Sequence, residues 1–256
     1  MSRLRLYARL ARLSGVIALG ACLASSLRIG ALAGATPSAA TRHRLCRWFL
    51  ARLAGALPFE LRLSGQCPDR PMLWLANHVS WTDIPLIGML QPMAFLAKSD
   101  VRRWPLLGWL AAEAGTQFIR RGGGDSAVLN RQLGAALQER GTLLIFPEGT
   151  TTDGTTLRPF HSRLLSSAIE TGTPIQPVAI RYWRNGEADA QAPFVGDDDL
   201  LTHLFRLLST DIAQVDIQLL PPIDSRAMAR NSLGRACHKA IAEALYGAVA
   251  EVPDAA

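Results

Sequence analysis

Acidic residues are absent from the first 59 positions of this 256-residue chain. Nine arginines lie in the same segment, so the formal net charge of +6 comes from the N-terminal part. The remainder carries 18 Lys and Arg residues against 21 Asp and Glu residues. A nucleic-acid-binding domain would carry clustered basic charge on its own surface, so we expect no nucleic-acid partner. Arginines interleaved with Leu, Trp and Phe fit an anionic membrane surface instead.

Cysteine is scarce, and the markers of metal or serine chemistry are missing. The four cysteines show no metal-ligand spacing, and a chain of this length does not need disulfide bonds for stability. No serine stands in a Gly-x-Ser-x-Gly elbow, which argues against an ordinary serine esterase. We therefore predict reduced cysteines and no metal site.

Residues 1–35 combine a basic amphipathic start with an apolar stretch from Leu13 to Leu27, which Arg28 interrupts. A bilayer span needs about 20 mostly apolar residues, so this stretch is marginal as a transmembrane helix unless Arg28 reaches a headgroup. A secretory signal peptide, an organellar transit peptide and an uncleaved anchor or interfacial hairpin all fit the composition. The uncleaved anchor or hairpin is our leading interpretation.

A Pro/Ser/Ala linker then leads to a second basic stretch, residues 42–58, with Leu45, Trp48, Phe49 and Leu53 at helical spacing. This stretch fits either a surface helix packed on the domain or a helix in contact with lipid. The absence of acidic partners favours lipid. We predict that residues 1–58 form a helical membrane-binding arm.

From Phe59 onward the pattern alternates between short apolar runs and helical segments. The runs bounded by turn residues predict strands, at residues 59–65, 71–77, 92–98, 115–120, 142–147, 174–180 and 215–221. The clearest helix is Asp125–Arg140, which Gly141 ends. This alternation predicts an α/β fold over residues 59–256, with a mixed central sheet of about seven strands flanked by helices.

The sharpest chemical signal is His78-x-x-x-x-Asp83, directly after the predicted strand at residues 71–77. Catalytic groups in open α/β sheets collect beyond the carboxyl ends of strands. A neutral imidazole can take a proton from an attacking hydroxyl, and a carboxylate on its other nitrogen would orient it. The alternative interpretation is that Asp83, with Pro85 close behind, is an ordinary helix N-cap.

A second signal, Phe146-Pro147-Glu148-Gly149-Thr150, follows the strand at residues 142–147. It puts a carboxylate and a flexible backbone at the same sheet edge as His78. A plain strand-to-loop turn would also satisfy Pro and Gly at these positions.

Four blocks in order resemble the glycerolipid acyltransferase family, which includes 1-acylglycerol-3-phosphate acyltransferases and ornithine-lipid acyltransferases. The resemblance covers roughly residues 60–225, and its blocks are His78 to Asp83, Phe118 to Arg121, Phe146 to Thr150 and Pro174 to Val178. One block would be weak evidence. Four in this order, at plausible spacing, are strong.

The resemblance implies a role for several residues. His78 is the general base and Asp83 orients it, while Arg121 binds the anionic headgroup of the acceptor. The third block implies acceptor binding at Glu148, Gly149 and Thr150. The fourth block places Pro177 near the acyl chain. Lys98 matches a lysine that is common after the third strand of the family.

Two positions depart from the family pattern. Thr151 stands where an arginine often follows the third block, and His161 stands where a lysine is common after the Pro-Phe pair. Both departures remove positive charge from the place where an acceptor phosphate would bind. Arg158 and Arg163 offer compensation, because a guanidinium binds phosphate with two hydrogen bonds. A Thr-rich continuation is also similar to the ornithine-lipid branch.

The family implies transfer of a fatty acyl group from an acyl thioester to a lyso-lipid hydroxyl such as that of 1-acylglycerol-3-phosphate. A lyso-ornithine lipid is the alternative acceptor, and a non-catalytic lipid-binding protein or a lipid hydrolase is the rival function. The co-substrate would be acyl carrier protein or coenzyme A thioester, with no other cofactor. Both donors are cytosolic, so we expect an inner-membrane protein whose site faces the cytoplasm.

Overall fold

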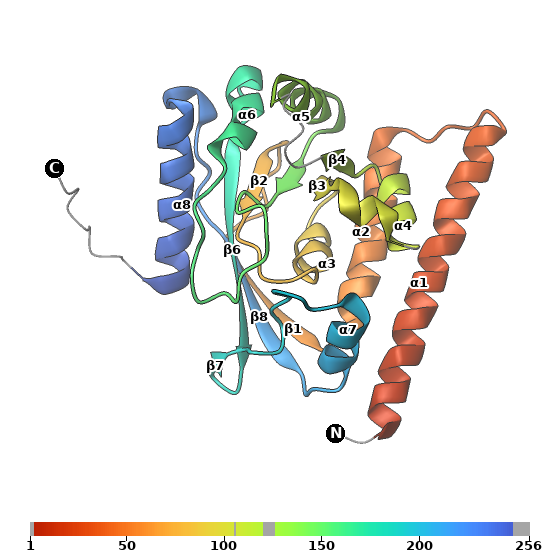
Figure 1. Ribbon diagram of the computed structural model, residues 1–256. Coiled ribbons are helices and arrows are strands. Elements are labelled where there is room, and N and C mark those ends of the chain that lie inside the picture. Colours follow the sequence, from red (N-terminus) through yellow and green to blue (C-terminus); the bar gives the residue numbers. More distant parts are fainter. Residues whose placement is uncertain (1–2, 105, 120–125, 248–256) are drawn as a thin grey trace.

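An eight-stranded mixed sheet forms the centre of the computed structural model, which describes residues 3–104, 106–119 and 126–247 (Figure 1). All seven predicted strands occur, and the α/β prediction is confirmed. The additional strand, β7, pairs with the end of β6. The strands are β1 (Phe59–Ser64), β2 (Leu73–Ala76), β3 (Ala94–Lys98), β4 (Gln117–Ile119), β5 (Leu143–Ile145), β6 (Ile175–Arg184), β7 (Glu187–Ala188) and β8 (Ala213–Leu219).

The strands run in the order β1-β8-β6-β2-β5-β3-β4. Pairing is parallel except between β6 and β8 and between β6 and β7. All four residues of β2 are buried, because helices cover both faces of the sheet at this central position. Because β5 and β6 both run parallel to β2, the carboxyl ends of the three strands share one edge of the sheet.

Helices form a layer on each side of the sheet. The helices are α1 (Arg3–Leu32), α2 (Ala39–Ala56), α3 (Asp83–Gly88), α4 (Leu107–Glu113), α5 (Ser126–Arg140), α6 (Ser166–Thr171), α7 (Leu200–Leu208) and α8 (Arg230–Tyr246). Helices α2 and α3 pack on one face, and α5, α6 and α8 pack on the other. The predicted helix Asp125–Arg140 corresponds to α5, although Asp125 lies outside the described residues.

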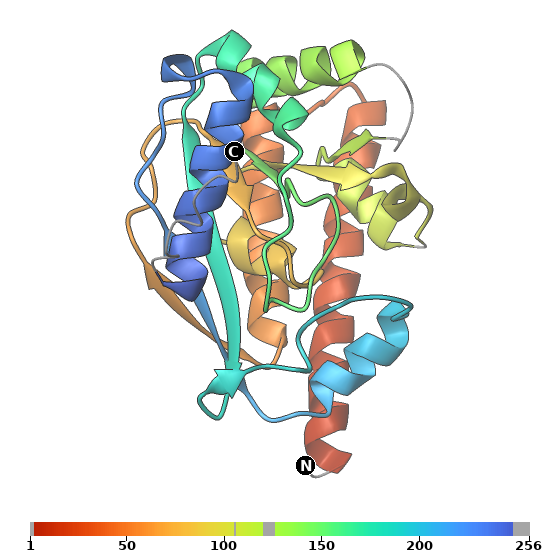
Figure 2. The same cartoon turned by 60° about the vertical axis from the view of Figure 1, so that its left-hand side comes forward.

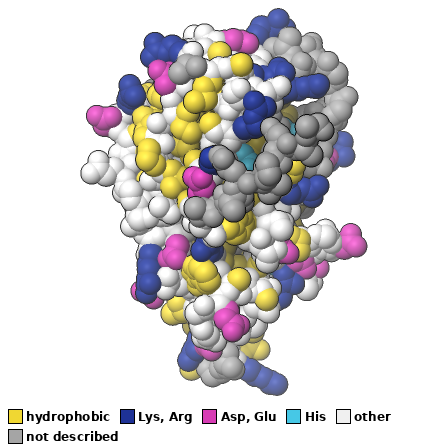
Figure 3. All heavy atoms as spheres, turned by 90° about the vertical axis from the view of Figure 1, so that its left-hand side faces the viewer, with side chains coloured by type: hydrophobic (Ala, Val, Ile, Leu, Met, Phe, Trp, Pro, Cys, Tyr) yellow, Lys and Arg dark blue, Asp and Glu magenta, His cyan; other side chains and the backbone are white. Residues whose placement is uncertain are grey.

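Alternation along the strands divides the core between these two layers. Trp74 and Ile180 face α2 and α3, whereas Leu73, Leu75 and Ile175 face α5, α6 and α8. On the outer side of α8, charged side chains of both signs are interspersed with apolar ones (Figure 3). That side of the molecule has the mixed character of an ordinary solvated surface.

Helix α1 continues through Arg28 for 30 residues and is long and apolar enough to cross a membrane. Its most apolar window has a mean hydropathy of 1.7, and only 11% of that window is buried. The N-terminal half of the helix contacts the protein body, where Arg5 pairs with Asp211 at 2.9 Å and Arg9 donates to the Leu208 carbonyl at 2.9 Å. Helix α1 therefore lies along the body instead of projecting from it (Figures 1 and 2).

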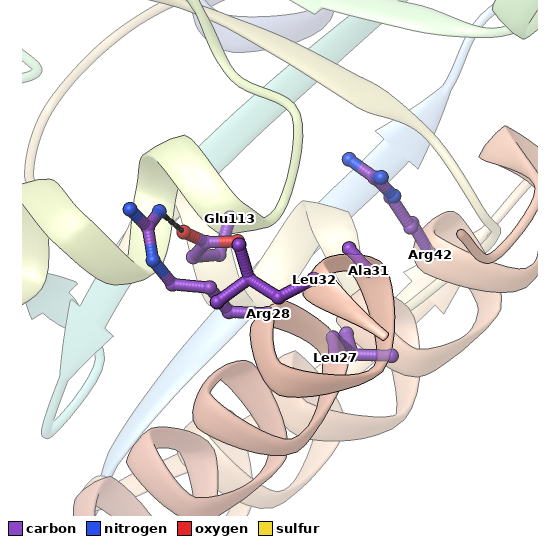
Figure 4. Close-up of a pocket in the computed structure, with 6 residues that line it drawn as sticks. All are labelled: Leu27, Arg28, Ala31, Leu32, Arg42 and Glu113. Atoms are coloured by element: carbon purple, nitrogen blue, oxygen red, sulfur yellow. Dashed lines mark hydrogen bonds and ion pairs between the residues drawn. The ribbon is translucent and has the colours of Figure 1, made fainter. Parts of the chain in front are cut away.

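The C-terminal end of α1 is also attached to the body. Arg28 pairs with Glu113 of α4 at 3.0 Å, beside a cavity of about 260 Å³ (Figure 4). Leu27 and Leu32 of α1 line this cavity, and Arg42 of α2 lies across from the ion pair. The interrupting arginine is thus satisfied by a carboxylate of the protein itself.

Helix α2 has one face in the core and another at the surface. Leu50 and Ala54 are buried against the sheet, so the interpretation of α2 as a helix packed on the domain holds for this face. Trp48 stays exposed, with the Arg52 guanidinium 3.5 Å from the centroid of its ring. Such a cation–π pair leaves an aromatic surface available for lipid.

The contact between α1 and α2 gives a test of the docked position of α1. A Cβ atom at the buried Gly20 would lie 2.4 Å from the Phe49 ring, whereas one at the exposed Gly15 would meet nothing within 4 Å. We predict that Gly20→Leu lowers the melting temperature of the detergent-purified protein through overpacking, which costs about 1–3 kcal/mol. Gly15→Leu, the matched control, should leave it unchanged or raise it, since Leu favours helix over Gly. Equal melting temperatures for the two variants would contradict the docked position.

Candidate active site

The site lies where β2 and β5 end side by side. Leu75 of β2 is paired in register with Ile145 of β5. His78 and Glu148 each follow these partners by three residues, so the two parallel strands deliver both side chains to the same level of the sheet edge. The backbone N–H of His78 donates to Glu148 Oε1 at 2.8 Å, which confirms that the two motifs meet.

The His78 ring contacts Asp83 through Nδ1, which lies 2.7 Å from Asp83 Oδ2. Oδ2 also accepts from the backbone N–H groups of Val79 at 2.8 Å and Ser80 at 3.0 Å. Asp83 is the first residue of α3 and Thr82 is its N-cap, so the interpretation of Asp83 as an ordinary N-cap is wrong. Its carboxylate turns back to the preceding loop and holds the imidazole.

These contacts determine the tautomer of His78. Because the carboxylate accepts at Nδ1, that nitrogen carries the proton and Nε2 keeps its lone pair. The ring stacks on Phe146, with 3.9 Å between centroids and 13° between planes. The His78 side chain is 18% exposed while that of Asp83 is fully buried, so a substrate can reach the imidazole but water cannot reach its carboxylate partner.

Tyr182 holds the other oxygen of the Asp83 carboxylate. Its hydroxyl donates to Asp83 Oδ1 at 2.5 Å and lies 2.8 Å from Thr82 Oγ1. Burial, followed by the negative charge of Asp83, raises the pKa of Tyr182 well above its ordinary value. The phenol therefore stays protonated and acts as a donor to the carboxylate.

Glu148 joins the two loops of the site through backbone contacts. Besides the His78 N–H, its carboxylate accepts from the Arg158 N–H at 2.9 Å. Burial raises the pKa of Glu148, and the two backbone hydrogen bonds act in the opposite direction. The Glu148 carboxylate thus holds the start of the loop between His78 and Asp83 in place, and acceptor binding by Glu148 stays a prediction.

The other residues of the third and fourth blocks take different positions. Gly149 adopts a left-handed φ of 70°, which suits glycine, and the half-buried Thr150 follows it in the same turn. Pro177 is buried in β6 opposite Leu75, below the level of His78. Its carbonyl accepts from the Leu220 N–H at 3.0 Å.

The family resemblance implies two further site residues, Lys98 and Arg121. Lys98 ends β3, which is separated from β2 by β5 on the same edge of the sheet. Arg121 lies outside the described residues. The roles that the family resemblance implies for both residues stay predictions.

Sequence reasoning missed a clamp formed by the segment before α7. The Phe194 N–H donates to the Val79 carbonyl at 3.0 Å, and the hydroxyl of Thr151 donates to the Phe194 carbonyl. The indole N–H of Trp81 donates to Nδ1 of His203 at 3.0 Å. The sequence around His203 gives no signal of this contact, because its partner lies 122 residues away.

The protonation state of His203 follows from its surroundings. Burial lowers its pKa, as does the neighbouring Arg206 guanidinium. The neutral ring accepts at Nδ1 and donates from Nε2 to the Pro193 carbonyl at 3.0 Å. His203 thus joins α7 to the loop between His78 and Asp83, and its ring carries no charge.

The fold and the site are those of an acyl-transfer enzyme. An oriented imidazole lies partly exposed at the edge of an α/β sheet. A model of the Acyltransferase family matches residues 59–181. The chain belongs to this family and is an O-acyltransferase, so the resemblance of the four blocks is confirmed.

Comparison with known proteins supports this assignment. The lyso-ornithine lipid O-acyltransferase of Pseudomonas aeruginosa is 56% identical over 98% of this chain and 97% of its own length. The 1-acyl-sn-glycerol-3-phosphate acyltransferase of Neisseria gonorrhoeae is 36% identical over 60% of this chain and 62% of its own. The crystal structure of the 1-acyl-sn-glycerophosphate acyltransferase of Thermotoga maritima shares the fold, with a TM-score of 0.58, 22% identity, and coverage of 79% and 78% of the two chains.

The hydroxyl of Tyr182 gives a prediction about the site. Tyr182→Phe keeps the ring, which packs edge-on to Phe59 at 5.3 Å, but it takes the donor from a buried carboxylate oxygen. We expect a loss of about 1–3 kcal/mol in unfolding free energy, with lower acyl transfer because Asp83 is less well held. Thermal unfolding in detergent measures the first effect and steady-state turnover the second.

Tyr246→Phe is the matched control. Tyr246 is 43% exposed, and its hydroxyl donates to the Gly154 carbonyl at a longer 3.3 Å, so its removal should cost about 0.5 kcal/mol or less. If Tyr182→Phe unfolds at the wild-type temperature, the hydroxyl does not support Asp83 as described.

Proposed function

We propose that this protein transfers a fatty acyl group from an acyl thioester to the hydroxyl of a lyso-ornithine lipid. The observation that carries the reaction type is the His78–Asp83 pair, with Nδ1 bound and Nε2 available. The acceptor is supported by the Pseudomonas aeruginosa relative, which matches nearly the whole chain. The 1-acylglycerol-3-phosphate acyltransferases match a shorter part of the chain at lower identity.

The reaction proceeds by direct attack on the thioester. His78 Nε2 accepts the proton of the acceptor hydroxyl while the hydroxyl oxygen forms a bond to the thioester carbonyl carbon. The carbon–sulfur bond then breaks, the thiolate leaves, and it takes up the proton that the imidazolium carries. Asp83 stabilises the imidazolium without taking its proton. The acyl thioester of acyl carrier protein or coenzyme A is the co-substrate, and no further cofactor or metal takes part.

The acceptor proposal agrees with the chemistry around the third block. An ornithine headgroup carries a carboxylate and no phosphate, so it needs fewer fixed cations than lysophosphatidic acid. Thr151 donates its hydroxyl to the Phe194 carbonyl, and His161 is exposed, with its backbone N–H on the Pro147 carbonyl. Arg121 would bind the ornithine carboxylate by the two-pronged geometry that suits guanidinium.

Membrane attachment comes from the N-terminal arm. Because both ends of α1 are tied to the body, α1 lies in the plane of the membrane surface and serves as an uncleaved anchor. The donors are cytosolic, so the protein binds the inner membrane with its site toward the cytoplasm. The exposed Trp48 and the arginines of α2 strengthen the attachment to anionic lipid.

A comparison of acceptors tests the proposed substrate. The purified full-length protein is incubated with labelled acyl thioester, of acyl carrier protein or of coenzyme A, and with lyso-ornithine lipid or lysophosphatidic acid. We expect a higher kcat/KM for lyso-ornithine lipid, whichever donor is the better one. A clear preference for lysophosphatidic acid would overturn the acceptor proposal and leave acyl transfer standing, whereas release of free fatty acid alone would indicate a hydrolase.

His78→Ala tests the mechanism. A lost general base lowers turnover by about 10²–10⁴-fold, and we expect kcat to fall within this range. The melting temperature should change little, because the His78 side chain is at the rim of the core and packs on one face of Phe146. Retention of more than roughly a tenth of wild-type turnover, with an intact melting temperature, would show that His78 is not the base.

A further inference from the structure

Exposed large hydrophobic side chains gather on one side of the molecule. Among the described residues, nine of the 15 such side chains lie on α1 or between residues 195 and 212. In the second stretch Leu201 is 64% exposed, Phe205 48% and Ile212 63%. An apolar cluster of this kind marks an interaction surface.

Helix α7 carries more apolar surface than its neighbours cover. His203 and Leu207 are buried against the body, while Leu204 and Leu208 pack against the leucines of α1. Leu201 and Phe205 belong to the same stripe, because residues 201, 204, 205 and 208 recur at helical i, i+3, i+4 and i+7 positions. The stripe therefore begins at the contact with α1 and continues to exposed side chains.

We propose that α7 is a second lipid-contacting element, which inserts Leu201 and Phe205 into the same bilayer surface that α1 contacts. Continuity with α1 identifies the occupant, since Leu204 and Leu208 of the stripe pack against α1, which carries exposed apolar side chains of its own. A lipid surface accommodates both sets together.

The charges around α7 are compatible with an anionic membrane. Asp198 is paired with Arg206 at 2.7 Å, and Asp211 with Arg5 at 2.9 Å. Asp199 is the N-cap of α7 and accepts from two backbone N–H groups. The acidic side chains at the rim are thus mostly engaged within the protein, and the basic first turns of α1 lie at the same end of the molecule.

Docking of α7 on the membrane would position the loop between His78 and Asp83 relative to the lipid. Trp81 donates to His203 of α7, and Phe194 of the preceding segment donates to the Val79 carbonyl. These bonds join α7 to the loop between His78 and Asp83 from two sides. Membrane contact by α7 thus holds the loop at a set depth, where an amphiphilic acceptor presents its hydroxyl while its chain stays in the bilayer.

Depth measurements test the contact without reference to catalysis. Full-length protein is reconstituted in vesicles of phosphatidylethanolamine and phosphatidylglycerol, with or without bromine on the acyl chains. The tryptophan emission added by Phe205→Trp should be quenched by the brominated chains. Met228→Trp, the matched control, lies just before α8 on the opposite layer and is 39% exposed; its added emission should not be quenched. Equal quenching or no quenching of the two would overturn the proposal.

A second measurement rests on the proposed acyl transfer. The double variant Leu201→Ser/Phe205→Ser should lower kcat/KM for a vesicle-embedded lyso-lipid by about tenfold or more. Activity on a water-soluble short-chain lyso-lipid should be unchanged. The control is Leu63→Ser/Met228→Ser, which changes two exposed apolar side chains elsewhere and should match the wild type on both acceptors.

The outcomes separate the two proposals. If Leu201→Ser/Phe205→Ser loses the same activity on the embedded and on the soluble acceptor, α7 is a purely structural support of the site. If the variant matches the wild type on both acceptors, lipid contact by α7 has no effect. Either result overturns this inference. If the wild-type protein transfers no acyl group to any lyso-lipid, the proposed function fails, while the quenching result still decides whether α7 contacts lipid.

Discussion

The buried carboxylate of Asp83 is the interaction on which the site depends. A charge with no solvent exposure is stable in a protein only when hydrogen bonds replace its hydration. Four donors do so here: two backbone N–H groups of the preceding loop, the His78 ring and the Tyr182 hydroxyl. The loop must fold tightly around the carboxylate to supply the first two. The conformation that stabilises the charge is therefore the one that orients the imidazole.

A second carboxylate supports this arrangement from the neighbouring strand. Glu148 binds the backbone N–H groups of His78 and Arg158, so the loops after β2 and β5 cannot move independently. Asn77 adds a third tie, because its side-chain amide bonds both the N–H and the carbonyl of Ile180 in β6. Three adjacent strands thus fix one histidine, and the proposed role of His78 as a general base requires such rigid support.

The sequence was informative where the signal is local. Short apolar runs between turn residues located seven strands. The His78–Asp83 pair was visible because both residues lie within a stretch of six. Tyr182 could not be found in this way, since it lies 99 residues from Asp83 and two residues beyond the strand predicted at residues 174–180. The link from Trp81 to His203 was hidden for the same reason. Both contacts depend on which strands become neighbours, and that is a property of the whole sheet.

The N-terminal arm shows a different limit of sequence reasoning. Composition predicted that residues 1–58 form a membrane-binding arm, but it left open whether the first segment, residues 1–35, spans the membrane, lies on it or is cleaved. In the sequence Arg28 interrupts an apolar stretch, and its partner Glu113 cannot be recognised because it lies 85 residues away in α4. With this partner the arginine is satisfied beside the body, and the helix has attachments at both ends. The helix is therefore held against the body at both ends, while only 11% of its most apolar window is buried.

This geometry also relates the chemistry to the membrane. In the proposed mechanism His78 becomes an imidazolium, and the Asp83 carboxylate beside it favours that charge. Phe146 covers one face of the His78 ring and limits the access of bulk water to it. The remaining approach is from the exposed edge of His78. The segment before α7 bonds the neighbouring Val79 carbonyl and continues into α7, so one stretch of chain contacts the loop that holds His78 and also packs against α1.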